Sequence, residues 1–115
     1  MSYLLSLKAH SDTRGNLVVI EKELGFDIKR VFYIYGVDAV ATRGGHRHKK
    51  TKQGLIVVSG SCIVSVADDG YFLNDPSMCV VLEPEDFHTM HSFSKNCVLL
   101  VLASEYYDKE DYIYD

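Results

Sequence analysis

The sequence has no tryptophan, only two prolines among its 115 residues, and no long apolar run. None of its apolar stretches approaches the roughly 20 residues that a membrane-spanning helix requires. Its N-terminus, Met-Ser-Tyr-Leu-Leu-Ser-Leu-Lys, lacks the basic region and apolar core of a secretory signal peptide. We therefore expect a cytoplasmic protein that does not act at a membrane.

Cysteine is also scarce. Cys62, Cys79 and Cys97 form no Cys-x-x-Cys pair, and each lies in an apolar stretch. An odd number of such residues is typical of buried thiols in a reducing compartment rather than of a disulfide framework.

An excess of positive charge is absent too, since the formal net charge is -4. Nucleic acid is therefore not an expected partner. The one basic cluster, residues 43–52, is interleaved with histidines and suits a small anion such as a phosphate. The chain is 47% hydrophobic and 24% charged, which is ordinary for a globular protein. Its length fits one domain, residues 1–115.

Short runs rich in β-branched and aromatic residues recur between turn signals, and no segment has apolar residues at helical spacing. This pattern predicts an all-β sandwich or barrel. A hairpin is expected around Ser59-Gly60-Ser61, and turns at residues 68–70 and 74–76. The acidic, tyrosine-rich residues 104–115 suit a short helix or turn capped by Ser104. The predicted strands are 17–20, 31–35, 55–58, 62–66, 79–82 and 97–103.

Two histidines one residue apart are the main chemical feature. On an extended backbone, His46 and His48 point to the same face because side chains alternate with period two. Gln53 follows, and His88 lies far downstream after the turn-rich segment 83–86. Two co-facial imidazoles favour a site for metal binding or proton transfer, unless they are simply solvated parts of a strand.

The residue types argue against a metal. Zinc, iron and manganese sites usually combine imidazole with an anionic carboxylate or thiolate, whereas Gln53 offers only a neutral oxygen. Imidazole can instead accept and return a proton near neutral pH. Positive charge from Arg43, Lys49 or Lys52 would favour the neutral, basic form of each histidine.

Other candidates are weaker when taken singly. Arg14 lies in an Asp-Thr-Arg-Gly turn that would form whatever the arginine does. His91 suits a surface position. Tyr33 alternates with Phe32 and Ile34, so an inward-facing tyrosine could be core or could bind a sugar or phosphate.

The spacing of His46, His48, Gln53 and His88 around a glycine turn resembles the two motifs of the cupin barrel, in which glutamate usually stands where this chain has Gln53. Nearly the whole chain is similar to the sugar-nucleotide 3,4-ketoisomerases, the WxcM-like cupins. Besides Gln53, the similar segments are residues 12–17, 28–34, 43–49, 60–62, 84–88, 93–94 and 97–113.

This resemblance implies a small cupin-type antiparallel β-barrel, or jelly roll, that needs no cofactor. It implies a dTDP-linked keto sugar as substrate and a homodimer, in which N-terminal strands can be exchanged. The implied reaction moves the keto group of dTDP-4-keto-6-deoxy-D-glucose from C4 to C3. Such a reaction serves the biosynthesis of a 3-amino-3,6-dideoxyhexose for surface polysaccharide, such as O-antigen.

The roles that follow are also implied by the resemblance. We expect His48 to be the carbon acid/base and His46 its partner, with the reverse assignment left open. The C4 configuration of the product is expected to be galacto. The residues expected to bind substrate are Arg14, Tyr33, Arg43, Gln53, His88 and His91.

Three alternatives remain at this point. A sugar-nucleotide 3,5-epimerase shares the early Asp-x-Arg-Gly turn and also deprotonates carbon beside a 4-keto group. A metal-dependent cupin would use the same histidines as ligands. A non-catalytic cupin would bind the sugar nucleotide without turnover.

Overall fold

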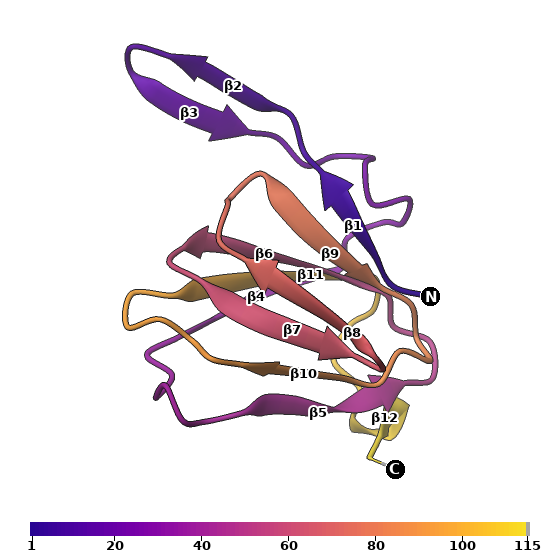
Figure 1. Ribbon diagram of the computed structural model, residues 1–115. Helices are drawn as coiled ribbons and strands as arrows, with labels where there is room; N and C mark the ends of the chain where they lie inside the picture. Colours follow the sequence, from indigo (N-terminus) through magenta and orange to yellow (C-terminus); the bar gives the residue numbers. More distant parts are fainter. Residues whose placement is uncertain (115) are drawn as a thin grey trace.

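The computed structural model describes residues 1–114 and consists almost entirely of antiparallel strands (Figure 1). The strands form two five-stranded sheets and a separate hairpin, so the predicted all-β class is confirmed. In order, the first sheet contains β1 (Tyr3–Ser6), β9 (Met78–Leu82), β6 (Gln53–Ser59), β11 (Val98–Ala103) and β4 (Arg30–Tyr35). The second contains β12 (Tyr112–Ile113), β5 (Arg43–His48), β10 (His88–His91), β7 (Cys62–Val66) and β8 (Asp69–Leu73).

Alternating apolar side chains of both sheets enclose the main core. Leu55, Val57, Leu99 and Val101 of the first sheet cluster with Val64 of the second, and all are almost fully buried. The other face of the first sheet is covered by residues 18–28, so Ile56 and Leu102 are buried as well. Within residues 1–114, no strand of one sheet pairs with a strand of the other, so hydrogen bonding between strands does not close a barrel.

The N-terminal hairpin extends away from the two sheets (Figure 1). It consists of β2 (Ala9–Asp12) and β3 (Gly15–Val18), which pair only with each other. The strand predicted at residues 17–20 therefore begins and ends earlier than expected. Arg14 lies in the turn and is exposed.

The hairpin predicted around Gly60 is wrong in its pairing. β6 pairs with β9 and β11, whereas β7 pairs with β10 and β8, so this turn carries the chain from one sheet to the other. The Ser-Gly-Ser sequence favours a tight turn but does not select the partners of the strands that flank it.

Two further local predictions need correction. The tight turn expected at residues 68–70 lies at 67–68, and Asp69 already begins β8. The 3-10 helix η1 (Lys109–Asp111) is capped by Asp108, whose side chain accepts from the backbone N–H of Glu110. Ser104 does not cap it, because its hydroxyl accepts from the backbone N–H of Lys52, at 2.8 Å.

All three cysteines are buried free thiols, as expected. Within residues 1–114 there is no helix long and apolar enough to span a membrane.

Candidate active site

A cavity of about 200 Å³ lies between the two sheets, with an apolar side and a polar side. The first sheet contributes mainly apolar side chains, together with Gln53. The second sheet contributes most of the polar groups. The lining residues are Phe32, Ile34, Arg43, Gly44, His46, Gln53, Leu55, His88, Met90, Val101 and Tyr112.

Strand register brings the histidines together. In the pairing of β5 with β10, His46 lies opposite His88. The ring centroid of His46 is 4.9 Å from that of His48 and 4.9 Å from that of His88. Gly44 permits this close approach, because a Cβ there would lie 2.9 Å from the backbone oxygen of His88.

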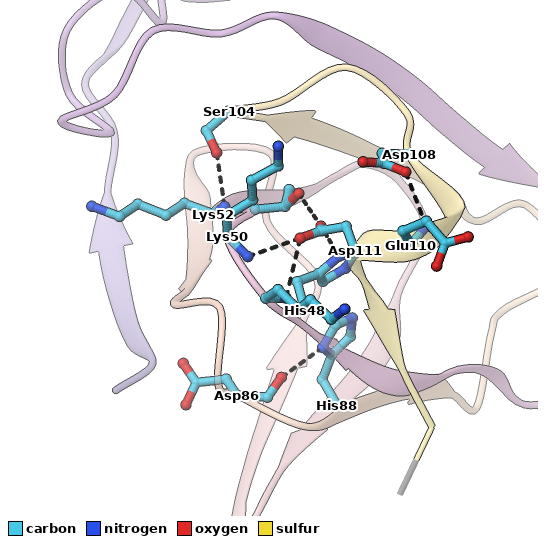
Figure 2. A network of polar contacts seen from close by, with 11 residues as sticks. His48, Lys50, Lys52, Asp86, His88, Ser104, Asp108, Glu110 and Asp111 are labelled. Carbon is cyan, nitrogen blue, oxygen red and sulfur yellow. Dashed lines mark hydrogen bonds and ion pairs between the residues drawn. The ribbon is translucent and has the colours of Figure 1, made fainter.

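His48 is fixed by a carboxylate that is distant in sequence. Its Nδ1 lies 2.8 Å from Oδ2 of Asp111, and both side chains are 3% exposed (Figure 2). Asp111 also accepts hydrogen bonds from the Thr51 hydroxyl and from the backbone N–H groups of Lys49 and Lys50. The other ring nitrogen of His48, Nε2, is buried and has no hydrogen-bond partner among the described residues.

The other two imidazoles are held by backbone oxygens. His88 Nδ1 lies 3.0 Å from the carbonyl oxygen of Asp86 (Figure 2). His46 forms a hydrogen bond with the backbone of Gly44. One nitrogen of each ring is thus engaged by a carboxylate or by the backbone, which orients the ring.

Burial keeps these histidines neutral. It lowers the pKa of His46 to about 4, helped by repulsion from His88 and His48. Burial is also the main cause of the lowered pKa of His48 and of His88. The positive charge expected from Arg43, Lys49 or Lys52 is therefore not the leading cause, although Arg30 makes a smaller contribution at His48. All three rings can accept a proton at neutral pH.

For the Asp111 carboxyl, the effect of burial on the pKa is smaller than the opposing effect of its hydrogen bonds. It raises the pKa of that carboxyl, but hydrogen bonds from Thr51, the Lys50 backbone and His48 lower it more. The net pKa is below the ordinary aspartate value, so Asp111 is a carboxylate at neutral pH.

The three histidines could also hold a divalent ion. Ring nitrogens of His46, His48 and His88 lie within 4.8 Å of one another, and some zinc sites use three imidazoles. Within residues 1–114, no carboxylate or thiolate joins this group, and Gln53 adds only a neutral oxygen. This donor set lacks the anionic ligand that most such sites contain.

The predicted substrate-binding residues fall into two groups. Arg43, Gln53 and His88 line the cavity together with His46. Arg14, Tyr33 and His91 do not. Arg14 pairs with Asp12 in the hairpin turn, Tyr33 is 63% exposed, and His91 Nε2 lies 2.9 Å from the Ser65 hydroxyl.

Sequence reasoning missed Thr51, Asp111 and Tyr112. The ring centroid of Tyr112 lies 4.8 Å from that of His46, and Asp111 holds His48. Both residues belong to the acidic, tyrosine-rich C-terminal segment, in which they look like their neighbours. Only the pairing of β12 with β5 brings them to the site.

The relatives found by comparison with known proteins are named as 3,4-oxoisomerases or 3,4-ketoisomerases. The curated TDP-4-oxo-6-deoxy-alpha-D-glucose-3,4-oxoisomerase of Aneurinibacillus thermoaerophilus is 44% identical over 117 residues, covering 96% of this chain and 84% of that protein. The crystal structure of a 3,4-ketoisomerase from Helicobacter canadensis matches with a TM-score of 0.95 and 37% identity, covering 99% of this chain and 90% of that one.

A third relative was solved with its ligand. A mutant of the 3,4-ketoisomerase QdtA from Thermoanaerobacterium thermosaccharolyticum, in complex with TDP-4-keto-6-deoxyglucose, matches with a TM-score of 0.90 and 44% identity. That match covers 99% of this chain and 87% of QdtA. The family model described as "FdtA: WxcM-like, C-terminal" matches residues 2–115. The chain therefore belongs to the FdtA family of WxcM-like C-terminal domains, as the similar segments along nearly the whole chain had indicated.

Proposed function

We propose that this chain is a 3,4-ketoisomerase that converts TDP-4-keto-6-deoxy-D-glucose to the 3-keto isomer. One observation carries the proposal: three neutral imidazoles cluster beside a cavity that His46 and His88 line, and His48 Nε2 is buried without a hydrogen-bond partner among the described residues. The relatives named above as 3,4-ketoisomerases support the same reaction.

The residues suit the chemistry. The C4 ketone acidifies the proton on C3, and His48 Nε2 removes that proton to give an enediolate. The same nitrogen returns a proton to C4, while His46 moves a proton from the C3 oxygen to the C4 oxygen. The product is an isomer of the substrate, so no oxidant, reductant or cofactor is consumed.

Substrate contacts follow from the cavity lining. Arg43 supplies positive charge for an oxyanion or a phosphate oxygen, and Gln53 and His88 orient the sugar. The enediolate forms among neutral imidazoles in a largely buried space, where a hydrogen bond to a developing negative charge is stronger than in water.

The assembly we propose is a homodimer with exchanged N-terminal strands, built on a cupin-type jelly-roll barrel of residues 1–115. Its support is the extended hairpin and the exposed apolar side chains of the edge strand β4. Leu17 of the hairpin is 57% exposed, and Val31 and Tyr35 of β4 are 56% and 69% exposed, an arrangement that a second copy would cover. In such a dimer, Arg14 and Tyr33 would reach substrate from positions outside the cavity of their own chain.

The setting we propose is cytoplasmic deoxysugar biosynthesis, for a 3-amino-3,6-dideoxyhexose of a surface polysaccharide. Three free buried thiols fit a reducing compartment. We propose the galacto configuration at C4 of the product, with Arg14 and His91 as the residues that bear on it.

The test is proton NMR of TDP-4-keto-6-deoxyglucose incubated in D2O with EDTA-treated enzyme. The expected product has its ketone at C3, and its coupling constants report the C4 configuration. The His48→Asn variant should lose turnover while its affinity for TDP, measured by calorimetry, stays nearly the same. Full activity of that variant would overturn the assignment of His48.

The same experiment separates the competing activities. An epimerase would leave the ketone at C4 and exchange protons at C3 and C5. A binding protein would retain the keto sugar tightly and leave its spectrum unchanged. The 37–44% identity to ketoisomerases makes both alternatives weaker than isomerisation.

A further inference from the structure

One side of the cavity is apolar across three neighbouring strands of the first sheet. Val101 lies opposite Phe32 in the pairing of β11 with β4, and opposite Leu55 in the pairing of β11 with β6. All three side chains line the cavity, and Val101 and Leu55 are each 1% exposed. We call Phe32, Val101 and Leu55 the apolar row.

The apolar row offers a ligand no hydrogen bond. None of its three side chains carries a donor or an acceptor. The backbone groups of Leu55 and Val101 point along the sheet, because β6 and β11 each pair with a strand on both sides. A hydroxyl group placed against this row would lose its hydrogen bonds to water without replacement, whereas a methyl group has none to lose.

The opposite side of the cavity is polar. His46 and His88 line it from the second sheet, where they lie opposite each other in the pairing of β5 with β10. A proton beside a ketone is removed perpendicular to the plane of the carbonyl group, so an imidazole approaches C3 and C4 from one face of the sugar ring. The other face of the ring then rests against the first sheet and its apolar row.

The hexose has one substituent that suits such a surface. In TDP-4-keto-6-deoxyglucose, C1 bears the diphosphate and C2, C3 and C4 bear oxygen, which leaves the C6 methyl group as the apolar substituent. We propose that the apolar row binds this methyl group and thereby selects 6-deoxy sugars over sugars with a hydroxyl group at C6. This inference rests on the proposed function, because the sugar must lie in this cavity. It does not depend on which histidine moves the carbon-bound proton.

Calorimetry of the wild-type chain with three ligands that undergo no turnover tests this selection. TDP-6-deoxyglucose and TDP-glucose differ only in the hydroxyl group at C6, and TDP alone reports the contribution of the nucleotide. An apolar pocket discriminates against one added hydroxyl group by about 10- to 100-fold, so TDP-6-deoxyglucose should bind at least about tenfold more tightly than TDP-glucose. Equal affinities of the two sugar nucleotides would overturn the proposal, and this comparison needs no variant.

Val101→Thr tests the assignment of the row. Threonine has nearly the shape of valine and brings one hydroxyl group to the wall, where it can pair with a hydroxyl group at C6. The preference for TDP-6-deoxyglucose should then fall below about threefold. Val57→Thr is the matched control, because Val57 is equally buried in the same core cluster but does not line the cavity. This control should keep the wild-type preference, and a folded Val101→Thr variant that also keeps it would show that the methyl group binds elsewhere.

The proposed function and this inference fail in different ways. If TDP-4-keto-6-deoxyglucose is isomerised but the two sugar nucleotides bind equally well, only the role of the apolar row is wrong. If the preference is found but no isomerisation takes place, the row selects the sugar in a protein that only binds it. If neither isomerisation nor preference is found, both proposals are wrong.

Discussion

The ring of Tyr112 packs against the imidazole of His48, with 4.6 Å between their centroids. The two residues lie opposite each other in the pairing of β12 with β5. Tyr112 also contacts His46 and lines the cavity, so the C-terminal segment forms one wall of the site.

Tyr112→Ala should lower kcat/KM about tenfold, or ~1.4 kcal/mol, because it removes a ring that packs against both histidines. Tyr112→Phe keeps the ring and should retain most of the activity. Steady-state kinetics of the two variants provide the measurement. An equal loss in both would show that the hydroxyl, rather than the ring, is what matters.

Gly60 occupies the turn between the sheets with a φ of +71°, a conformation that favours glycine. A Cβ there would lie 2.7 Å from Asn96 Oδ1 and 2.8 Å from the Cα of Cys97. Gly60→Ala should therefore lower the free energy of unfolding by about 2–4 kcal/mol, measured by urea denaturation.

Gly70→Ala is the matched control for that change. A Cβ at Gly70 would meet nothing within 4 Å, and its φ lies outside the positive range. Its unfolding free energy should stay within about 0.5 kcal/mol of the wild-type value. Equal destabilisation of the two variants would contradict the steric argument for Gly60.

Acid should destabilise the fold through the buried histidines. The pKa of His46 is about 4 in the folded chain and near 6.5 when unfolded, so the unfolded state binds more protons between these values. Stability is thus complete above pH 6.5 and declines as the pH falls toward 4. Between pH 7.5 and 5, the loss from His46 should be on the order of 2 kcal/mol.

Urea denaturation at the two pH values measures this loss, and His46→Gln tests its origin. The variant should lose less stability on acidification than the wild type, because glutamine does not titrate. The remaining loss is assigned to His48 and His88, whose pKa values are lowered in the same direction. Identical pH dependence in variant and wild type would rule out His46 as a contributor.

Metal removal should leave the activity unchanged, because the polar lining lacks an anionic metal ligand. Added Zn²⁺ should instead inhibit competitively, since three ring nitrogens within 4.8 Å can bind it and would lose their free lone pairs. EDTA should reverse this inhibition, and His88→Gln should weaken it. Activity that disappears with EDTA and returns with a divalent ion would contradict the prediction.

The sequence by itself determined the features that depend on local periodicity. Alternation along a strand places His46 and His48 on one face, and apolar runs of strand length predict four of the five strands of the first sheet and, in the second sheet, β7. Turn chemistry at Gly60 also predicts a tight turn, and its φ of +71° fits one, although the hairpin expected there does not form. These properties need only neighbouring residues, so they can be read from the chain.

Only the tertiary structure decided which strands pair and what surrounds the histidines. The partners of β6 and β7, the extended hairpin that carries Arg14, and the outward position of Tyr33 all follow from long-range packing. Asp111 lies 63 residues from His48, and nothing in its own segment separates it from the other acidic residues there. Register between distant strands is set by burial of their side chains, and the lowered histidine pKa values result from that same burial.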